Sequence, residues 1–185
     1  MTRIRSMFAA ACLGAMPFTV AACASLPDEV DRAEIDRDSR QALTTLYAEN
    51  KAAKAIGAQS QAVLVFPSIV KGALGVGGAY GAGEMIQGGR TENYYSSFTG
   101  SWGLQAGAQS YGYVVFLMNK DAVDYIEESD GWEIGVGPTV VVVNAGVAQN
   151  LSTTSLQDDA YAFIFDQKGL MAGLSIEGTK ITKLK

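Results

Sequence analysis

Residues 73–83, with the sequence ALGVGGAYGAG, decide the fold of this 185-residue chain. Every odd-numbered position in the stretch is alanine or glycine, whereas Leu74, Val76 and Tyr80 lie at even positions. Because successive side chains of a β-strand point to opposite faces, the stretch predicts a strand with one nearly bare face. A bare face permits strong curvature, or the close approach of a helix, another sheet or a ligand.

Residues 101–109 alternate in the same way, but one of their faces is polar. Trp102 and Leu104 share a face with two alanines, and the other face carries serine, glycine and glutamine. Such alternation is typical of a strand with one face on a core. The sequence predicts about eight short strands, among them residues 62–66, 111–118, 132–137, 139–143, 160–165 and 170–176.

Two helices accompany these strands. Over residues 28–56, apolar residues such as Leu43 and Leu46 recur at three- and four-residue spacing, which predicts one long helix. Asn119 is suited to cap a short internal helix over residues 120–128.

Together the elements predict an α+β domain with a strongly curved antiparallel β-sheet or a small barrel. The strands of a membrane-spanning barrel would alternate as well. Residues 111–118 and 139–143, however, are apolar on both faces, whereas such a barrel has a polar lumen. We therefore expect the curved sheet.

The N-terminus has the three parts of a secretory signal. Arg3 and Arg5 supply the positive charge, residues 7–20 are apolar, and small residues lead into Cys23. A signal that ends in small residues and cysteine resembles the bacterial lipobox, in which that cysteine receives a diacylglycerol. The alternatives are an ordinary signal peptide or a short membrane anchor, but the apolar stretch is shorter than the roughly 20 residues that span a bilayer.

These features divide the chain into a lipoprotein-type signal peptide (1–22), a lipidated tether (23–27) and a folded domain (28–185). Because Ala24, and no aspartate, follows the cysteine, we expect a lipid-anchored protein of the outer membrane that faces the periplasm.

Removal of residues 1–22 would leave 163 residues with 12 basic and 19 acidic side chains, a formal charge of −7. An acidic chain has no electrostatic footprint for nucleic acid. Net charge would not attract the chain to an anionic membrane either, so the acyl chains must provide anchoring. Because Cys12 leaves with the signal and Cys23 is acylated, no thiol remains for a disulfide, a metal or catalysis.

The sequence offers little for catalysis. It has no histidine, which is the commonest general base and zinc ligand. The stretch 173–177 has Glu177 where a nucleophile elbow needs its second glycine, and the glycine-rich motifs lack the residues of nucleotide-binding loops. Asp158 and Asp159 form an adjacent pair that is more typical of a solvated loop than of acid–base work. We expect no enzyme, no cofactor and no metal.

Three glycine-rich motifs resemble the SYLF domain family. They are FPSIVKG with GVGGAYG (66–72 and 75–81), GLQAGAQ (103–109) and GLMAGLSIEG (169–178), and they occur in the family's order. The resemblance implies a lipid-binding domain; eukaryotic members bind phosphoinositide-rich membranes, fungal ones also bind actin, and bacterial ones are commonly envelope lipoproteins. Eukaryotic lipid binding draws on a basic N-terminal segment, whereas residues 28–38 are acidic here, so we carry over neither phosphoinositide preference nor actin binding.

The sequence thus predicts a non-enzymatic, lipid-anchored envelope protein whose SYLF-like domain binds phospholipid membranes. The alternative is a structural envelope lipoprotein whose bare glycine faces pack against a protein partner, and a hydrolase with an unfamiliar carboxylate site is a remote third. Lys71, Arg90 and Lys168 lie near expected strand ends and are the candidate contacts for lipid phosphate.

Overall fold

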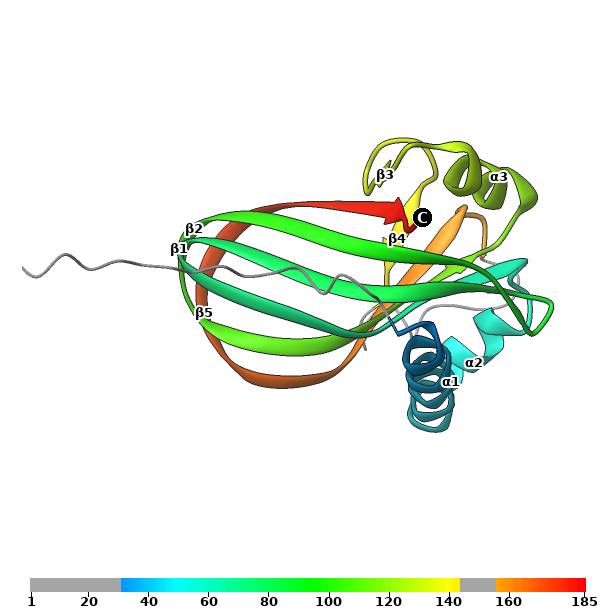
Figure 1. The fold of residues 1–185 in the computed structure, drawn as a ribbon, viewed down its shortest axis with the longest axis horizontal. Coiled ribbons are helices and arrows are strands. Elements are labelled where there is room, and N and C mark those ends of the chain that lie inside the picture. Colours follow the sequence, from blue (N-terminus) through cyan, green and yellow to red (C-terminus); the bar gives the residue numbers. More distant parts are fainter. Residues whose placement is uncertain (1–30, 144–155) are drawn as a thin grey trace, which may run out of the picture.

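The computed structural model describes residues 31–143 and 156–185 and shows an α+β fold with a strongly curved sheet, as predicted (Figure 1). The elements, in chain order, are α1 (Arg32–Glu49), α2 (Lys51–Gly57), β1 (Ala62–Gln87), β2 (Arg90–Leu117), α3 (Lys120–Glu128), β3 (Trp132–Glu133), β4 (Val140–Val142) and β5 (Ala160–Lys183). The sheet order is β1-β2-β5-β3, with antiparallel neighbours. β4 pairs with β5 in parallel, so the sheet is mixed and not wholly antiparallel.

The prediction of many short strands is wrong, because β1, β2 and β5 are three very long strands of 26, 28 and 24 residues. Each runs away from the helices, bends back at the far end of the molecule and returns (Figure 1). In β1 the pairing with β2 shifts register between Leu74 and Val76, and Gly75 between them has a φ of 75°. Glycine adopts this conformation without strain, so the strand bends there without a loop.

The bare face of residues 73–83 packs against the first half of its own strand. A Cβ added at Gly77 would lie 2.5 Å from the Cβ of Ala73, and one at Gly81 would lie 2.7 Å from the Ser68 carbonyl oxygen. At Gly83 the added Cβ would lie 2.1 Å from the Val65 carbonyl oxygen. The sequence did not determine which element would approach this bare face. In the structure that element is the other arm of β1, and the small residues allow the two arms to touch.

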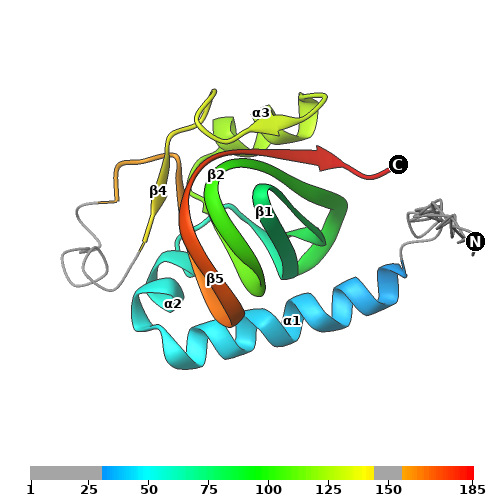
Figure 2. The same ribbon diagram turned by 90° about the vertical axis from the view of Figure 1, so that its left-hand side faces the viewer.

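Near the helices both faces of the sheet are buried. Leu64 and Phe66 belong to an inner apolar cluster that also contains Met85 on the returning arm and Ala122 of α3. The intervening side chains, such as Val65, belong to an outer cluster with Leu46 of α1 and Ile56 of α2. Figure 2 shows α1 lying across the outer side of the sheet. We call this half of the sheet the root.

The helices partly follow the prediction. Helix α3 spans the predicted residues, and the Asn119 side chain accepts a hydrogen bond from the Ala122 N–H at 2.8 Å, as an N-cap should. The single long N-terminal helix is wrong, because Asn50 has an extended conformation, ends α1 and caps α2 through the Ala53 N–H. Asp31 is the N-cap of α1, and residues 28–30 lie outside the described part.

Candidate functional site

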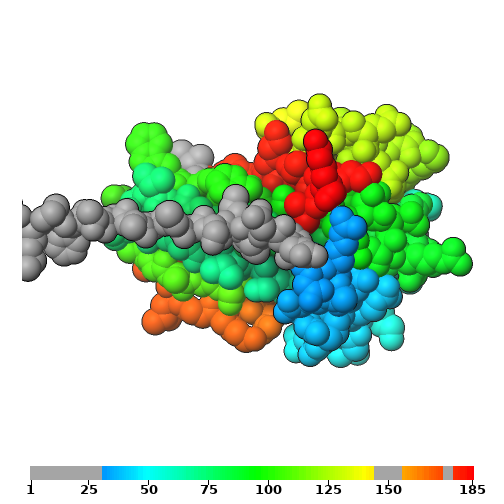
Figure 3. Space-filling view, in the orientation of Figure 1, coloured from blue at the N-terminus to red at the C-terminus, as the bar shows by residue number. Residues whose placement is uncertain are grey.

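The far end of the folded sheet exposes large apolar side chains. Leu104 is 89% exposed, Leu74 85%, Trp102 76% and Val76 70%. Val76 and Trp102 are direct partners in the β1–β2 ladder, so their side chains lie on the same face. These four residues, which we call the apolar tip, border the bend at Gly75. In Figure 3 the helices of the described residues lie at the opposite end of the sheet.

Apolar exposure continues along the outer face of both arms. Tyr80 and Phe98 form the next exposed apolar pair on one arm, and Val70 and Leu170 are exposed on the other. Monomeric proteins rarely leave so many large apolar side chains exposed in one region, and such patches mark contact with another protein, a ligand or a membrane.

The strand segments around the apolar tip contain no charged residues. No Asp, Glu, Lys or Arg occurs in residues 72–83, 93–119 or 169–176, which form the middle of β1, most of β2 and the middle of β5. The acidic residues of α1 lie at the other end of the molecule (Figure 1). The tip can therefore leave water without desolvating an ionised side chain on these segments.

The inner face of the far half is small and polar. Ser97, Thr99, Ser101 and Gln105 are all buried there. Gln105 donates a hydrogen bond to the Ser101 hydroxyl at 2.9 Å, and the hydroxyls of Thr99 and Thr179 are 2.8 Å apart. Polarity is thus reversed relative to an ordinary soluble domain, with hydroxyl and amide groups inside and apolar groups outside.

An ion pair with a buried lysine crosses this interior. Lys71 of β1 is only 5% exposed, and its ammonium pairs with the Glu177 carboxylate of β5. β1 and β5 are not neighbours in the sheet, so this contact joins two strands across the inside of the curl. Tyr111 packs against the inner apolar cluster, and burial, followed by the negative charge of Glu177, raises the pKa of this tyrosine.

The structure does not gather the three predicted phosphate contacts into one patch. Lys71 lies within β1 on the inner face, so its expected position at a strand end is wrong. Arg90 is exposed beside the β1–β2 turn, at the root. Lys168 is exposed and pairs with Asp166 at 2.9 Å, but it lies within β5, so its expected position at a strand end is wrong as well. Lipid contact by any of the three stays a prediction.

The alternation over residues 101–109 corresponds to two different faces, and Trp102 and Leu104 lie on the exposed one. Alternation defines two faces but not which one is inward. The sequence does contain a signal that indicates which face is exposed. Three glycine-rich segments lack charge, and in residues 73–83 and 101–109 the face opposite the large residues carries only small or polar side chains.

The adjacent acids Asp158 and Asp159 have structural contacts. The carboxylate of Asp159 accepts hydrogen bonds from the Thr139 N–H, the Thr139 hydroxyl and the Asn119 amide. These bonds, with that of the Thr139 backbone first, lower the pKa of Asp159. Asp158 accepts a bond from the Tyr161 hydroxyl at 3.3 Å. Asp159 thus fixes the start of β5 to the residues before β4 and α3.

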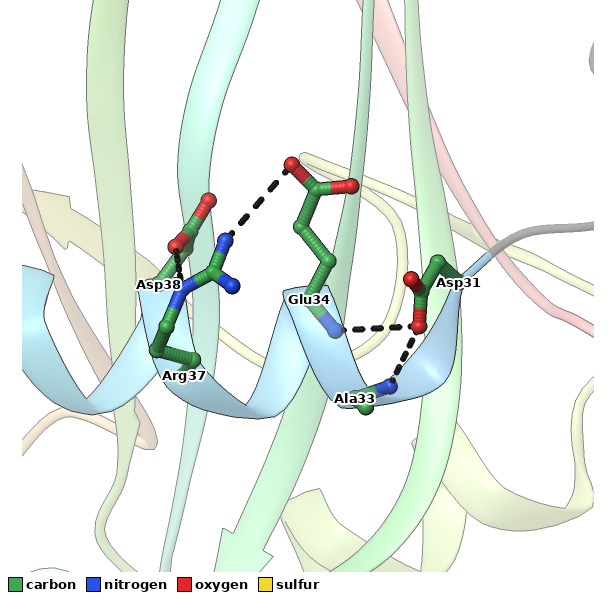
Figure 4. Close-up of polar contacts among 5 residues, drawn as sticks. All are labelled: Asp31, Ala33, Glu34, Arg37 and Asp38. Carbon is green, nitrogen blue, oxygen red and sulfur yellow. Dashed lines mark hydrogen bonds and ion pairs between the residues drawn. The ribbon is translucent and has the colours of Figure 1, made fainter.

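The acidic residues at the start of α1 form local surface contacts (Figure 4). Asp31 accepts from the N–H groups of Ala33 and Glu34, and Arg37 lies between the carboxylates of Glu34 and Asp38. Within the described ranges, no group of three or more His, Cys, Asp or Glu side chains is arranged to hold a metal ion.

Two of the predicted membrane features concern the N-terminal segment. Cys23 and the signal segment lie outside the described residues. Among the residues that the structure does describe, no helix is both long and apolar enough to cross a bilayer.

A comparison with protein families gives a match. Residues 98–185 match the family model described as Ysc84: Las17-binding protein actin regulator. The match starts within β2 and contains the second and third glycine motifs, whereas the first motif precedes it. No curated protein matches the chain.

Proposed function

We propose that the chain is a non-enzymatic, lipid-anchored envelope protein whose domain binds phospholipid membranes. The premise is that residues 98–185 belong to the matched family, which is the SYLF family that the glycine motifs resemble. The observation that carries the proposal is the apolar tip, which would enter the bilayer surface with the sheet bend leading. The acyl chains on Cys23 would hold the protein at the outer membrane, facing the periplasm.

The size of the tip is sufficient for this role. Burial of one large apolar side chain is favourable by about 1.5–3 kcal/mol, so four contribute roughly 6 kcal/mol or more before the cost of immobilising the protein. The uncharged segments around the tip add no penalty for burying an ionised group. Stable membrane attachment generally takes two signals, and the lipid anchor and the tip would be those two.

Apolar side chains, and not charged ones, would make the membrane contact, because the charges of the chain do not favour a contact with an anionic membrane. The chain would carry a charge of −7 after removal of the signal, and Lys71 is buried and paired. The family description concerns an actin regulator that binds Las17. For a chain with an export signal, we propose the membrane as the partner instead.

The alternative function is a structural lipoprotein whose tip packs against a protein partner. Exposed apolar residues would serve an interface equally well. The uncharged borders of the tip favour the bilayer, since a protein interface usually has a polar, charged rim.

Tryptophan fluorescence tests the proposal at the tip itself. The chain has two tryptophans, Trp102 at the tip and Trp132, which is fully buried in the inner cluster. The full chain carrying Cys23→Ser, which cannot be acylated, is mixed with phospholipid vesicles that contain brominated acyl chains. We expect Trp102 emission to shift to shorter wavelength and to be quenched, because its indole enters the acyl region.

The matched control is Trp102→Phe in the same chain, which keeps Trp132 and should show neither change. The N-terminal segment contains no tryptophan, so its own membrane contact cannot produce the signal. Co-sedimentation with the vesicles without any change in Trp102 emission would reject insertion of the tip and favour the structural alternative.

A further inference from the structure

A row of four residues crosses the outer face of the sheet, four residues from the apolar tip along β1 and β2. Tyr80 of β1 pairs with Phe98 of β2, Phe98 pairs with Lys180 of β5, and Lys180 pairs with Glu133 of β3. Side chains of directly paired residues project to the same face. The row therefore places two aromatic rings, an ammonium and a carboxylate side by side.

A groove of 430 Å³ lies at the charged end of this row. Its lining is Phe98, Gly100, Glu133, Ile134, Val136, Gly178, Thr179 and Lys180. Phe98 and Val136, each 57% exposed, give it apolar walls, and Glu133 and Lys180 are exposed. The volume is within the range of sites for small ligands.

The two charges in the groove are available to a ligand. Within residues 31–143 and 156–185, neither Lys180 nor Glu133 forms an ion pair or a side-chain hydrogen bond. Gly131 adjoins the lysine, and a Cβ added there would lie 2.4 Å from Lys180 Cε. The glycine thus leaves room for the lysine stem beside β3.

The groove lies at the depth where headgroups would be if the tip enters the bilayer. Phe98 precedes Trp102 by four residues, which is about 13 Å along a strand. The headgroup layer on each side of the hydrocarbon is roughly 5–7 Å thick. With Trp102 inserted in the acyl region, the row of Tyr80 and Phe98 reaches the headgroups, where aromatic side chains are commonly enriched.

We propose that this groove binds the headgroup of a phospholipid that carries both a phosphate and a primary ammonium, as in phosphatidylethanolamine. The inference rests on the proposed membrane function. Lys180 contacts the phosphate, Glu133 accepts hydrogen bonds from the ammonium, and Phe98 and Val136 contact the glycerol and the upper acyl chain. Paired opposite charges match a zwitterionic headgroup, whereas Glu133 repels a purely anionic one.

The headgroup preference is testable with two kinds of vesicle. Both contain phosphatidylcholine, and in one of them part of it is replaced by phosphatidylethanolamine. The full Cys23→Ser chain is titrated with each, and Trp102 emission reports binding. We expect about fivefold tighter binding to the phosphatidylethanolamine vesicles, since a trimethylammonium cannot donate a hydrogen bond to Glu133.

Two substitutions then separate the site from general electrostatics. Glu133→Gln should abolish the preference while retaining binding to both vesicles. It should also strengthen binding to phosphatidylglycerol vesicles, because a negative charge is removed. Lys180→Gln should weaken binding to both zwitterionic vesicles about threefold to fivefold. Lys183→Gln and Glu128→Gln, which alter exposed charges outside the groove, are the matched controls and should leave the preference intact.

Equal binding to the two vesicles, or a preference that survives Glu133→Gln, would overturn the headgroup site and leave tip insertion standing. A preference for phosphatidylglycerol that only Lys180→Gln alters would overturn the site as well, because the groove would then bind an anionic lipid. Trp102 emission that responds to no vesicle would overturn both the site and the proposed function.

Discussion

The root and the tip are built from the same three strands, yet they place their side chains in opposite ways. At the root, alternate residues of β1 enter two apolar clusters, one between the arms and one under α1 and α2. At the tip, the inner face holds serine, threonine and glutamine, and the large apolar side chains are exposed. Strand pairing continues through both halves, so secondary structure alone does not separate the part that stabilises the fold from the part that is free to bind.

The largest expected contrast is between two leucines. Leu64 is fully buried at the root, and Leu64→Ala should lower the free energy of unfolding by about 2–5 kcal/mol, because it leaves a cavity. Leu104→Ala at the tip should change it by less than about 0.5 kcal/mol. Vesicle affinity should respond the other way, with about a tenfold loss for Leu104→Ala. Urea unfolding and Trp102 titration measure the two effects, and a large stability loss at Leu104 would contradict the division into root and tip.

The contact between the two arms of β1 predicts the next effect. Gly83→Ala adds a Cβ only 2.1 Å from the Val65 carbonyl oxygen, so the arms must separate, at a cost of about 1–3 kcal/mol. Gly78→Ala is the matched control in the same arm, since its Cβ would have an ordinary contact of 3.7 Å with the Thr99 carbonyl oxygen. Thermal melting distinguishes the two variants. Equal melting temperatures would mean that the arms are not in contact in solution.

The ion pair across the interior predicts a smaller effect with an asymmetry. Glu177→Gln leaves the buried Lys71 ammonium without its charged partner and should destabilise the domain by about 1–2 kcal/mol. The cost is smaller than for a fully buried pair, because the Glu177 side chain is 37% exposed. Lys71→Met should cost less, since methionine fills the buried space and the remaining carboxylate reaches water. Urea unfolding of both variants measures the order. A larger loss of stability for Lys71→Met than for Glu177→Gln would show that neutralising the buried lysine charge is not the main contribution of this ion pair.

Local patterns allowed the sequence to predict some elements closely. Asn119 and the residues after it contain everything that α3 needs, because a cap and one helical face are defined within a few residues. The bend at Gly75 could not be recognised in this way. It depends on contacts such as that between Gly83 and Val65, which lie 18 residues apart, and in sequence a bent strand resembles two strands joined by a turn.

Which face of residues 101–109 is exposed could not be predicted from the alternation of the sequence alone, for a related reason. A period of two residues separates the face of Trp102 from that of Ser101, but the inward direction depends on how tightly the sheet folds back. At the bend, small residues such as Ala73, Gly77 and Ser101 pack closely together inside, and the tryptophan is directed outward. Cys23 and the signal segment lie outside the described residues, and the anchor stays a prediction.

The smallest expected effect concerns the one carboxylate that is fully buried among the described residues of the root. Glu84 has no exposed surface, and its Oε1 has no hydrogen-bond partner in the described part of the chain. Burial raises the pKa of Glu84 above its usual 4.5; the hydrogen bond from the Thr91 hydroxyl lowers it, and the negative charge of Asp36 raises it again. The folded state therefore holds this proton more tightly than the unfolded chain.

The sign of the pH dependence follows from that difference. As pH rises from the usual glutamate pKa through the raised one, the unfolded chain loses the proton first, so the stability of the parent falls and then levels off. Glu84→Gln removes the titration and keeps an oxygen for Thr91. Near neutral pH the variant should be more stable than the parent by about 1 kcal/mol or less, and in acid, where Glu84 is protonated, the advantage should disappear. Melting curves in acid and near neutral pH measure this advantage, and Glu92→Gln, at an exposed position, is the control. A pH-independent advantage for Glu84→Gln would show that packing, and not the buried charge, causes it.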